Sequence, residues 1–159
     1  MIPLPQIELA RPDDAAAIAA MSRDYIESGL GWNWTRLRVL KAVRDSGSNV
    51  AVARHGDTLL GFGIMLYGEQ HAHLSLLGVH HAHRRIGLGG ALLAWLEKSA
   101  AVAGLEAIHL EARVDNDSAI GFYRAQGYTR TGSVPGYYRG VVDAVRLEKR
   151  LRSTSPLGS

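Results

Sequence analysis

The residues with the clearest chemical meaning form a basic turn rich in glycine, Arg84-Arg85-Ile86-Gly87-Leu88-Gly89-Gly90. An apolar run before the turn predicts a buried strand, and an apolar run after it predicts a helix. Glycines let a backbone approach an anion closely, and the free N–H groups and the dipole at a helix start favour that anion. The pattern predicts a site for a phosphorylated ligand. The simpler alternative is that the arginines are surface charges.

A second group of residues has side chains that can exchange protons or bind a ligand. Glu111 lies in a segment where apolar and polar residues alternate, which puts it on the polar face of a strand. Asn116 and Tyr123 are seven residues apart, two turns of a helix, and share one helix face. Each has a simpler interpretation: Glu111 pairs with Arg113 or Arg130, Asn116 only caps the helix, and Tyr123 is a core aromatic.

Histidines are dense in the middle of the chain, at His71, His73, His80, His81, His83 and His109. His71 and His73 alternate on one strand face, and the next three lie in a turn. No acidic partner is spaced among them, so we predict no metal site. The chain also has no cysteine, which excludes disulfides, thiolate metal sites and a cysteine nucleophile.

The elements that would position these residues alternate in type along the chain. Strands are expected at residues 7–10, 49–54, 58–67, 71–79, 107–114, 128–133 and 143–151. Helices are expected at residues 13–28, from residue 35, at residues 87–103 and at residues 115–126. This order implies an α/β sandwich with a mixed, mostly antiparallel sheet and helices on both faces.

Three local features of this assignment can be checked against a structure. Asp13 is expected to cap the first helix, and Thr35 the second. The buried stripe of the third helix is expected to end at Val102. The inward face of the strand that carries Glu111 is expected to end at Val114.

Length and composition predict one globular domain over residues 1–152, followed by a disordered tail at residues 153–159. The net charge is +3, but lysines and arginines are scattered, so we expect no nucleic-acid partner. No apolar run approaches the roughly 20 residues needed to span a bilayer, so we expect no membrane association. The absence of a visible secretory signal and of cysteine predicts a cytoplasmic protein. For the oligomeric state, a monomer and a homodimer are both open.

The order of elements and the motifs resemble the GCN5-related N-acetyltransferase (GNAT) superfamily from about Ile7 to Leu151. Its signature Arg/Gln-x-x-Gly-x-Gly/Ala matches Arg84-x-x-Gly87-x-Gly89. The block from Leu110 to Tyr128 is most similar to the ribosomal-protein-alanine N-acetyltransferases and N-terminal acetyltransferases, and so is Gly136-Tyr137-Tyr138-Arg139. Two features depart from the pattern: His80-His81-Ala82-His83 replaces an acidic residue and a proline, and Gly78 replaces a larger apolar residue.

The resemblance implies that acetyl-coenzyme A (acetyl-CoA) is the co-substrate. The backbone of Leu77, Gly78 and Val79 would pair with its pantetheine arm, and Asn116 would contact the cofactor. Its pyrophosphate would be bound by Arg84, Arg85, Ile86, Gly87, Leu88, Gly89 and Gly90. Glu111 would be the general base and Tyr123, twelve residues later, the general acid.

The predicted reaction is transfer of an acetyl group to a primary amine by direct attack in a ternary complex. A lysine or N-terminal amine must lose a proton to attack, and the leaving thiolate must gain one. The acceptor is either a protein N-terminus or a small molecule, and Trp32 or Trp34 either lines its pocket or belongs to the core. A domain that only binds acyl-CoA as a sensor is the alternative from another class.

Overall fold

The computed structural model describes residues 5–27, 32–80, 82, 87–138, 140 and 142–151. The expected tail at residues 153–159 lies outside them. The strands are β1 (Gln6–Leu9), β2 (Ser48–His55), β3 (Thr58–Tyr67), β4 (His71–Val79), β5 (Ala107–Arg113), β6 (Thr129–Tyr138) and β7 (Val142–Arg150). The helices are α1 (Ala15–Met21), α2 (Arg36–Arg44), α3 (Leu88–Val102) and α4 (Asp117–Ala125).

The strands form one sheet in the order β1-β2-β3-β4-β5-β7-β6. The β4–β5 pairing is parallel and covers His71–His73, whereas β1–β2, β2–β3, β5–β7 and β6–β7 are antiparallel. The expected mixed, mostly antiparallel α/β sheet is therefore confirmed.

The chain divides into two compact units. The first unit comprises residues up to Tyr67 together with Leu74–Leu96. The second comprises Gly68–His73 and the residues from Glu97 onward. Whether residues 1–152 act as one domain stays a prediction. None of the helices in the described part of the chain is long and apolar enough to cross a membrane.

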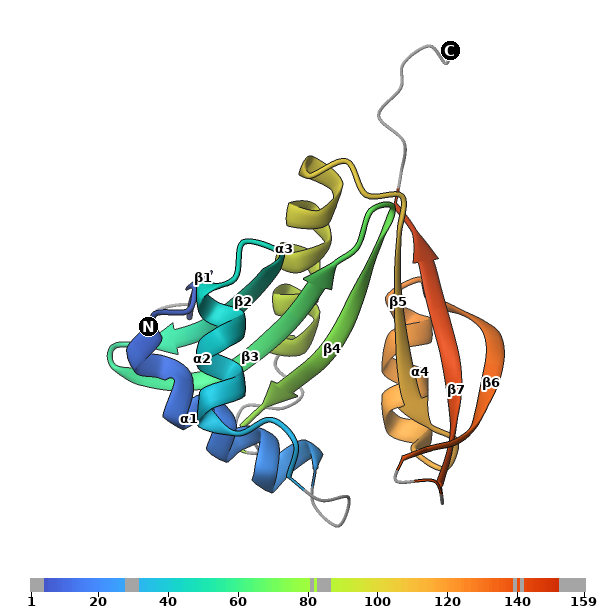
Figure 1. Cartoon of the computed structure of the whole chain (residues 1–159), viewed down its shortest axis with the longest axis horizontal. Helices are drawn as coiled ribbons and strands as arrows, with labels where there is room; N and C mark the ends of the chain where they lie inside the picture. The colour runs from blue at the N-terminus through green and yellow to red at the C-terminus, as the bar shows by residue number, and fades with distance from the viewer. Residues whose placement is uncertain are drawn as a thin grey trace. The chain divides into compact units, whose positions relative to one another are not determined.

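In the first unit, helices cover both faces of the strands (Figure 1). Phe62 and Ile64 of β3 join the buried core formed with α1 and α2, because they share one face of the strand. The alternate residues Gly61 and Gly63 lie under α3. A Cβ atom on Gly63 would come within 2.6 Å of the Leu96 side chain. Glycine in β3 therefore lets α3 approach the sheet closely.

In the second unit, β5, β6 and β7 form an antiparallel group joined to the start of β4. Ile108, Leu110 and Leu147 of this group are buried. The ring of Tyr123 on α4 packs edge-on against Tyr128 at 5.7 Å between ring centres, and the Tyr128 hydroxyl donates to Glu97. These contacts fix α4 within its own unit.

Several local expectations need correction. Asp13 is not the N-cap, because it is the Asp14 carboxylate that accepts from the Arg11 N–H, and a 3₁₀ turn (Pro12–Asp14) precedes α1. After Met21 the helix continues as a π-helical turn (Ser22–Ile26). Thr35 caps α2 as expected, with its hydroxyl accepting from the Arg38 N–H.

Two residues predicted to end an inward-facing apolar surface are exposed instead. Val102 is 81% exposed and Val114 is 47% exposed, because the chain turns into solvent directly after each element. In addition, β6 runs to Tyr138 rather than ending at Ser133. Its register shifts beside β7 accommodate this longer strand.

Candidate active site

The glycine-rich turn ends at the start of α3, in the first unit. Arg84, Arg85 and Ile86 lie outside the described residues. Gly87 has φ +83°, a conformation that favours glycine, and a Cβ atom there would meet nothing within 4 Å. The first hydrogen bond of the helix joins the Ala91 N–H to the Gly87 carbonyl.

The N–H groups of Leu88, Gly89 and Gly90 precede that bond, so they point out of the helix end. The open space beside Gly87 and these donors fit an anionic phosphate group.

Leu77, Gly78 and Val79 form the end of β4, also in the first unit. Gly78 is buried, and a Cβ atom there would lie 2.9 Å from the Phe62 ring and 3.1 Å from Ile26. Phe62 therefore fills the space that a larger residue at position 78 would need. This explains the departure from the family pattern at Gly78.

Glu111 lies on β5 in the second unit, and its side chain is only 4% exposed. Three side chains from other strands donate hydrogen bonds to it. His73 Nε2 of β4 lies 2.5 Å from Oε1, Arg146 Nε of β7 lies 2.9 Å from Oε2, and the Tyr137 hydroxyl of β6 lies 3.1 Å from Oε1. We call these four residues the Glu111 network.

Strand register creates this network. The parallel pairing of β4 with β5 places His73 opposite His109, and Glu111 is the next residue on that face. The antiparallel pairing of β5 with β7 places Glu111 opposite Arg146. The alternative pairing of Glu111 with Arg113 or Arg130 is wrong, since Arg113 binds Asp115 and Arg130 binds Ser133.

The network keeps Glu111 ionised. Burial raises the pKa of this carboxyl, but the hydrogen bond and charge of His73 and the hydrogen bonds of Arg146 and Tyr137 lower it to about 2. Burial lowers the pKa of His109, and the neighbouring His73 lowers it further. Glu111 is thus a stable anion held among donors.

The structure places Glu111 beside two of the histidines, although no acidic partner is spaced among them in the sequence. His73, His109 and Glu111 bring possible ligand atoms within 4.8 Å of one another. However, the guanidinium of Arg146 already compensates the Glu111 charge, and Tyr137 also donates to that carboxylate. A second cation would compete with Arg146, so we interpret the cluster as an ion-paired hydrogen-bond network.

The other two predicted site residues belong to α4. Asn116 is its N-cap, with the side-chain oxygen accepting from the Ala119 N–H at 3.1 Å. Burial raises the pKa of Tyr123, and so does the neighbouring Tyr138. The Tyr123 hydroxyl therefore holds its proton at neutral pH.

Sequence reasoning missed His73, Arg146 and Tyr137 as partners of Glu111. Strand alternation placed His73 and Glu111 on polar faces, which was the available signal. Which strands lie next to each other, and in what register, is not contained in that alternation.

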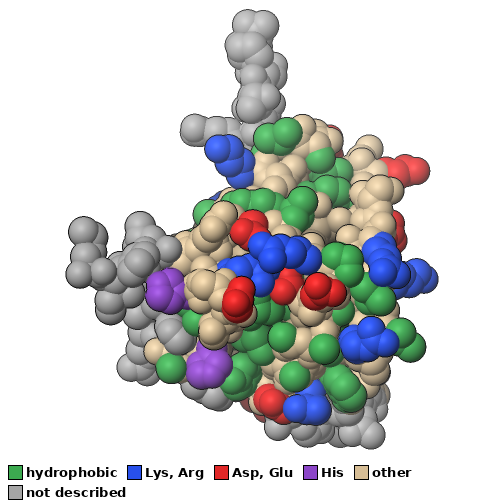
Figure 2. Space-filling model, turned by 90° about the vertical axis from the view of Figure 1, so that its left-hand side faces the viewer, with side chains coloured by type: hydrophobic (Ala, Val, Ile, Leu, Met, Phe, Trp, Pro, Cys, Tyr) green, Lys and Arg blue, Asp and Glu red, His purple; other side chains and the backbone are tan. Residues whose placement is uncertain are grey.

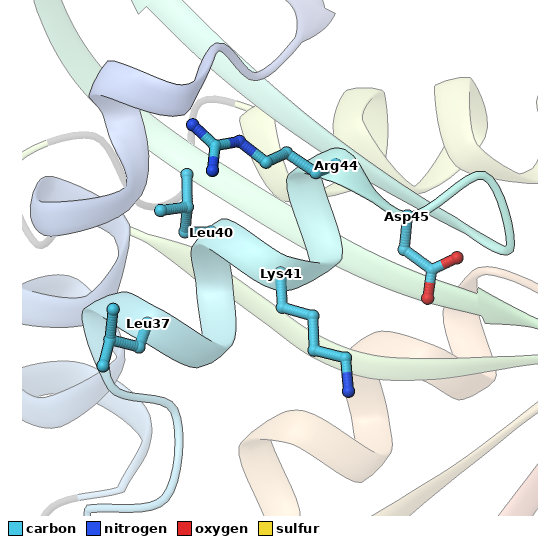
Figure 3. Close-up of a pocket in the computed structure, with 5 residues that line it drawn as sticks. All are labelled: Leu37, Leu40, Lys41, Arg44 and Asp45. Carbon is cyan, nitrogen blue, oxygen red and sulfur yellow. The ribbon is translucent and has the colours of Figure 1, made fainter.

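A surface hollow elsewhere in the first unit does not involve the predicted site. It is lined by Leu37, Leu40, Lys41, Arg44 and Asp45 of α2 and its C-terminal end. In Figure 3 the Leu40 and Arg44 side chains point to one side of the helix, and Lys41 and Asp45 to the other. These groups do not converge on a common ligand position.

Figure 2 shows one face of the molecule, where acidic and basic side chains lie next to each other among hydrophobic ones. On the described part of that face the charge is mixed. Such mixing is typical of a solvated surface and differs from the basic stripe that nucleic-acid binding requires.

The sequence comparisons identify the family. Residues 15–128 match the model of the acetyltransferase (GNAT) family. The chain belongs to the GNAT acetyltransferase family. The expected family, fold and reaction class are thereby confirmed, and enzymes of this family act on amine acceptors.

Relatives of known sequence cover different shares of the chain. An acetyltransferase of Pectobacterium atrosepticum is 28% identical over 92% of this chain and 95% of its own length. N-alpha-acetyltransferase RimI of Mycobacterium tuberculosis is 39% identical over 55% of this chain and 56% of its own length. An uncharacterised protein of Mycobacterium leprae is 41% identical, but the chain spans only 24% of its length.

Solved structures share the GNAT fold. The ribosomal-protein-S18-alanine N-acetyltransferase of Escherichia coli aligns with a TM-score of 0.82 at 20% identity, over 96% of this chain and 97% of that chain. YncA of Salmonella typhimurium, solved with acetyl-CoA, aligns with a TM-score of 0.79 at 22% identity, over 95% of this chain and 96% of that chain.

Proposed function

We propose that this protein transfers the acetyl group of acetyl-CoA to a primary amine, with a protein N-terminal α-amine as the acceptor. The observation that carries the proposal is the Glu111 network, in which a buried carboxylate contacts a partly exposed histidine of the second unit. A domain that only binds acyl-CoA has no need for proton-handling groups.

The first unit supports the part of the proposal that concerns acetyl-CoA binding. The N–H groups of residues 88–90 and the open space beside Gly87 suit the pyrophosphate. Arg84 and Arg85 would add positive charge, and the backbone of residues 77–79 would pair with the pantetheine arm. Asn116 would contact the cofactor as well as cap α4.

The second unit supports the proton transfers. The attacking amine must give up a proton, and the Glu111 network offers an acceptor for it. The leaving thiolate has a pKa similar to that of a cysteine thiol, about 8.5, and Tyr123 would supply its proton. The chain has no cysteine to carry an acetyl group, so direct attack on the thioester is the simplest route.

The choice of acceptor rests on the relative RimI, whose name assigns it an N-alpha-acetyltransferase activity. Its likeness covers only part of both chains, so a small amine is the alternative acceptor. An α-amine also has the lower pKa, about 7.7–8.0 against about 10.4 for lysine, and is the easier group to deprotonate.

The test is an acetylation assay with acetyl-CoA and two matched panels. One holds peptides that differ only in a free or blocked N-terminus, each with an internal lysine. The other holds amino acids, polyamines and aminoglycosides. We expect acetylation of the free N-terminus, located by mass spectrometry. Acetylation confined to lysine or to small amines would refute the acceptor, and binding of acetyl-CoA without any transfer would favour the sensor.

A further inference from the structure

The outer face of helix α2, in the first unit, carries exposed side chains that the proposed function does not use. Leu37, Lys41 and Arg44 follow one another along it at spacings of four and three residues, so they form one stripe (Figure 3). All three are exposed, and Leu37 is 68% exposed. The opposite face of the helix buries Val39 and Ala42 in the core. A single exposed leucine is ordinary, so the surroundings of Leu37 decide what it does.

A second hollow adjoins the one beside Leu37. The first has a volume of about 470 Å³, and the second, of about 290 Å³, is lined by Leu9 at the end of β1 and by Val43 on α2. Arg44 and Asp45 line both hollows, so the two are continuous. Leu9 is 54% exposed. Together the hollows form a shallow groove in the first unit, which we call the α2 groove and define by Leu9, Leu37, Lys41, Val43 and Arg44.

The charged residues of α2 are all basic, namely Arg36, Arg38, Lys41 and Arg44. Arg36 and Arg38 occupy the first turn, where the helix dipole disfavours positive charge. Lys41 and Arg44 are like charges three residues apart, which also destabilises a helix. No acidic residue within the helix offsets these costs. A departure from local rules without a local compensation is typical of a functional surface.

Carboxylates from other elements do not neutralise this charge. Across the part of the chain that the structure describes, no ion pair involves Arg36, Lys41 or Arg44. Asp45 directly follows α2, and its Oδ1 accepts a hydrogen bond from the Gly47 N–H at 2.8 Å. The α2 groove therefore combines exposed leucines with positive charge that is available to a ligand.

We propose that the α2 groove binds an extended acidic segment of a partner protein. Carboxylates of the segment pair with Lys41 and Arg44, and its apolar side chains enter the two hollows and cover Leu37 and Leu9. The side chains that line the first hollow do not converge on one point, which suits an elongated ligand better than a small one (Figure 3). Basic side chains beside an apolar strip are how acidic peptide motifs are recognised.

Two other classes of anionic partner fit this surface less well. Single-stranded nucleic acids bind by stacking on aromatic side chains, and no aromatic residue is among the described residues that line either hollow. A helix that inserts into an anionic membrane needs a broad apolar face, and α2 buries its apolar face in the core of the protein. A protein segment is therefore the favoured occupant.

The experiment measures, by fluorescence anisotropy, the binding of labelled peptides about 12 residues long, which span up to roughly 40 Å when extended. The first peptide repeats Glu-Leu-Glu-Ser, the second has glutamine in place of glutamate, and the third has serine in place of leucine. Each has a blocked N-terminus and no lysine, so none can be acetylated as an amine acceptor. The binding result is therefore independent of the proposed function.

The double variant Lys41→Gln/Arg44→Gln and the variant Leu37→Gln test the groove, and Lys98→Gln/Arg124→Gln is the matched control. All five residues are exposed on helices and glutamine is a good helix former, so each variant should fold, which circular dichroism checks. We expect the first peptide to bind the parent most tightly. The double variant should lower that affinity roughly 2–30-fold and Leu37→Gln about 5-fold or more, while the control stays near parental. Added salt should weaken binding to the parent more than to the double variant.

Equal affinity of the parent for the glutamate and glutamine peptides would overturn the proposal, as would a dissociation constant weaker than about 1 mM for the first peptide. An equal loss of affinity in the control variant would also overturn it, because net charge rather than the groove would then bind the peptide. Single-stranded DNA and vesicles that contain phosphatidylserine are measured in parallel. If either binds more tightly than the first peptide and loses its binding in the groove variants, the groove belongs to that class of partner instead.

Discussion

Tyr123 keeps its proton because desolvation of its half-buried side chain disfavours the phenolate. Burial raises the pKa of Tyr123, and the neighbouring Tyr138 raises it further. A group of this kind cannot accept a proton from an amine near neutral pH. Family resemblance implied that it donates its proton to the thiolate, and this role stays a prediction.

At this scale we predict that Tyr123→Phe lowers kcat by about 10²-fold or more, with little change in acetyl-CoA affinity. The hydroxyl is needed as the thiolate leaves rather than for binding. The matched control is Tyr128→Phe, which removes a neighbouring hydroxyl that donates to Glu97 and should alter stability but not kcat. Equal kcat in Tyr123→Phe and the parent would show that another group or water protonates the sulfur.

Helix α3 has glycines with positive φ at both ends, Gly87 with φ +83° and Gly104 with φ +87°. A Cβ atom at either position meets nothing within 4 Å. The two sites carry the same conformational demand and differ in position, because Gly87 precedes the free N–H groups and Gly104 follows the last turn. The helix therefore provides its own control for the binding hypothesis.

We predict that Gly87→Val weakens acetyl-CoA binding and that Gly104→Val does not. Each substitution should cost roughly 1–2 kcal/mol of stability from the left-handed backbone, which a denaturant titration measures. Calorimetry at a temperature where both variants are folded then isolates the effect on binding. Similar affinities in the two variants would remove the start of α3 from the cofactor site.

At the scale of the whole molecule, Glu111 and His109 of the second unit link folding to pH below neutrality. Glu111 is ionised in the fold down to about pH 2, whereas an unfolded glutamate takes up a proton near pH 4.3. Because its folded pKa is depressed, Glu111 stabilises the fold above that range and loses this effect as the pH falls toward 2. His109 has a lowered pKa as well, so its effect starts to be lost below about pH 6.5.

We predict that the free energy of unfolding falls in two stages as the pH is lowered. His109→Gln should remove the stage that begins near pH 6.5, and Glu111→Gln should remove the stage between about pH 4.5 and 2, worth up to about 3 kcal/mol. Urea titrations at a series of pH values, followed by spectroscopic signals from the second unit, measure both stages. A Glu111→Gln variant with the parent's acid dependence would contradict the role of the network in stability.

The sequence by itself determined the order and type of the elements. The signals that specify them depend on contacts over a few residues, so they can be identified in the local sequence. They are the alternation of the strands, the glycines that end helices, and capping residues such as Thr35 and Asn116. The signature at Gly87 and Gly89, joined to the downstream Asn116 and Tyr123, also identified the family without any structure. Errors fell at element ends, as with Val102, the last residue of α3, which is exposed although it continues the apolar period of the helix.

Only the tertiary structure decided what surrounds Glu111. Its partners come from three other strands, and Arg146 lies 35 residues away along the chain. Strand alternation says which face a residue takes but not which strand lies beside it or in which register. The parallel pairing that brings His73 to Glu111 joins residues 38 positions apart in the sequence, so only the sheet made this histidine part of the candidate active site.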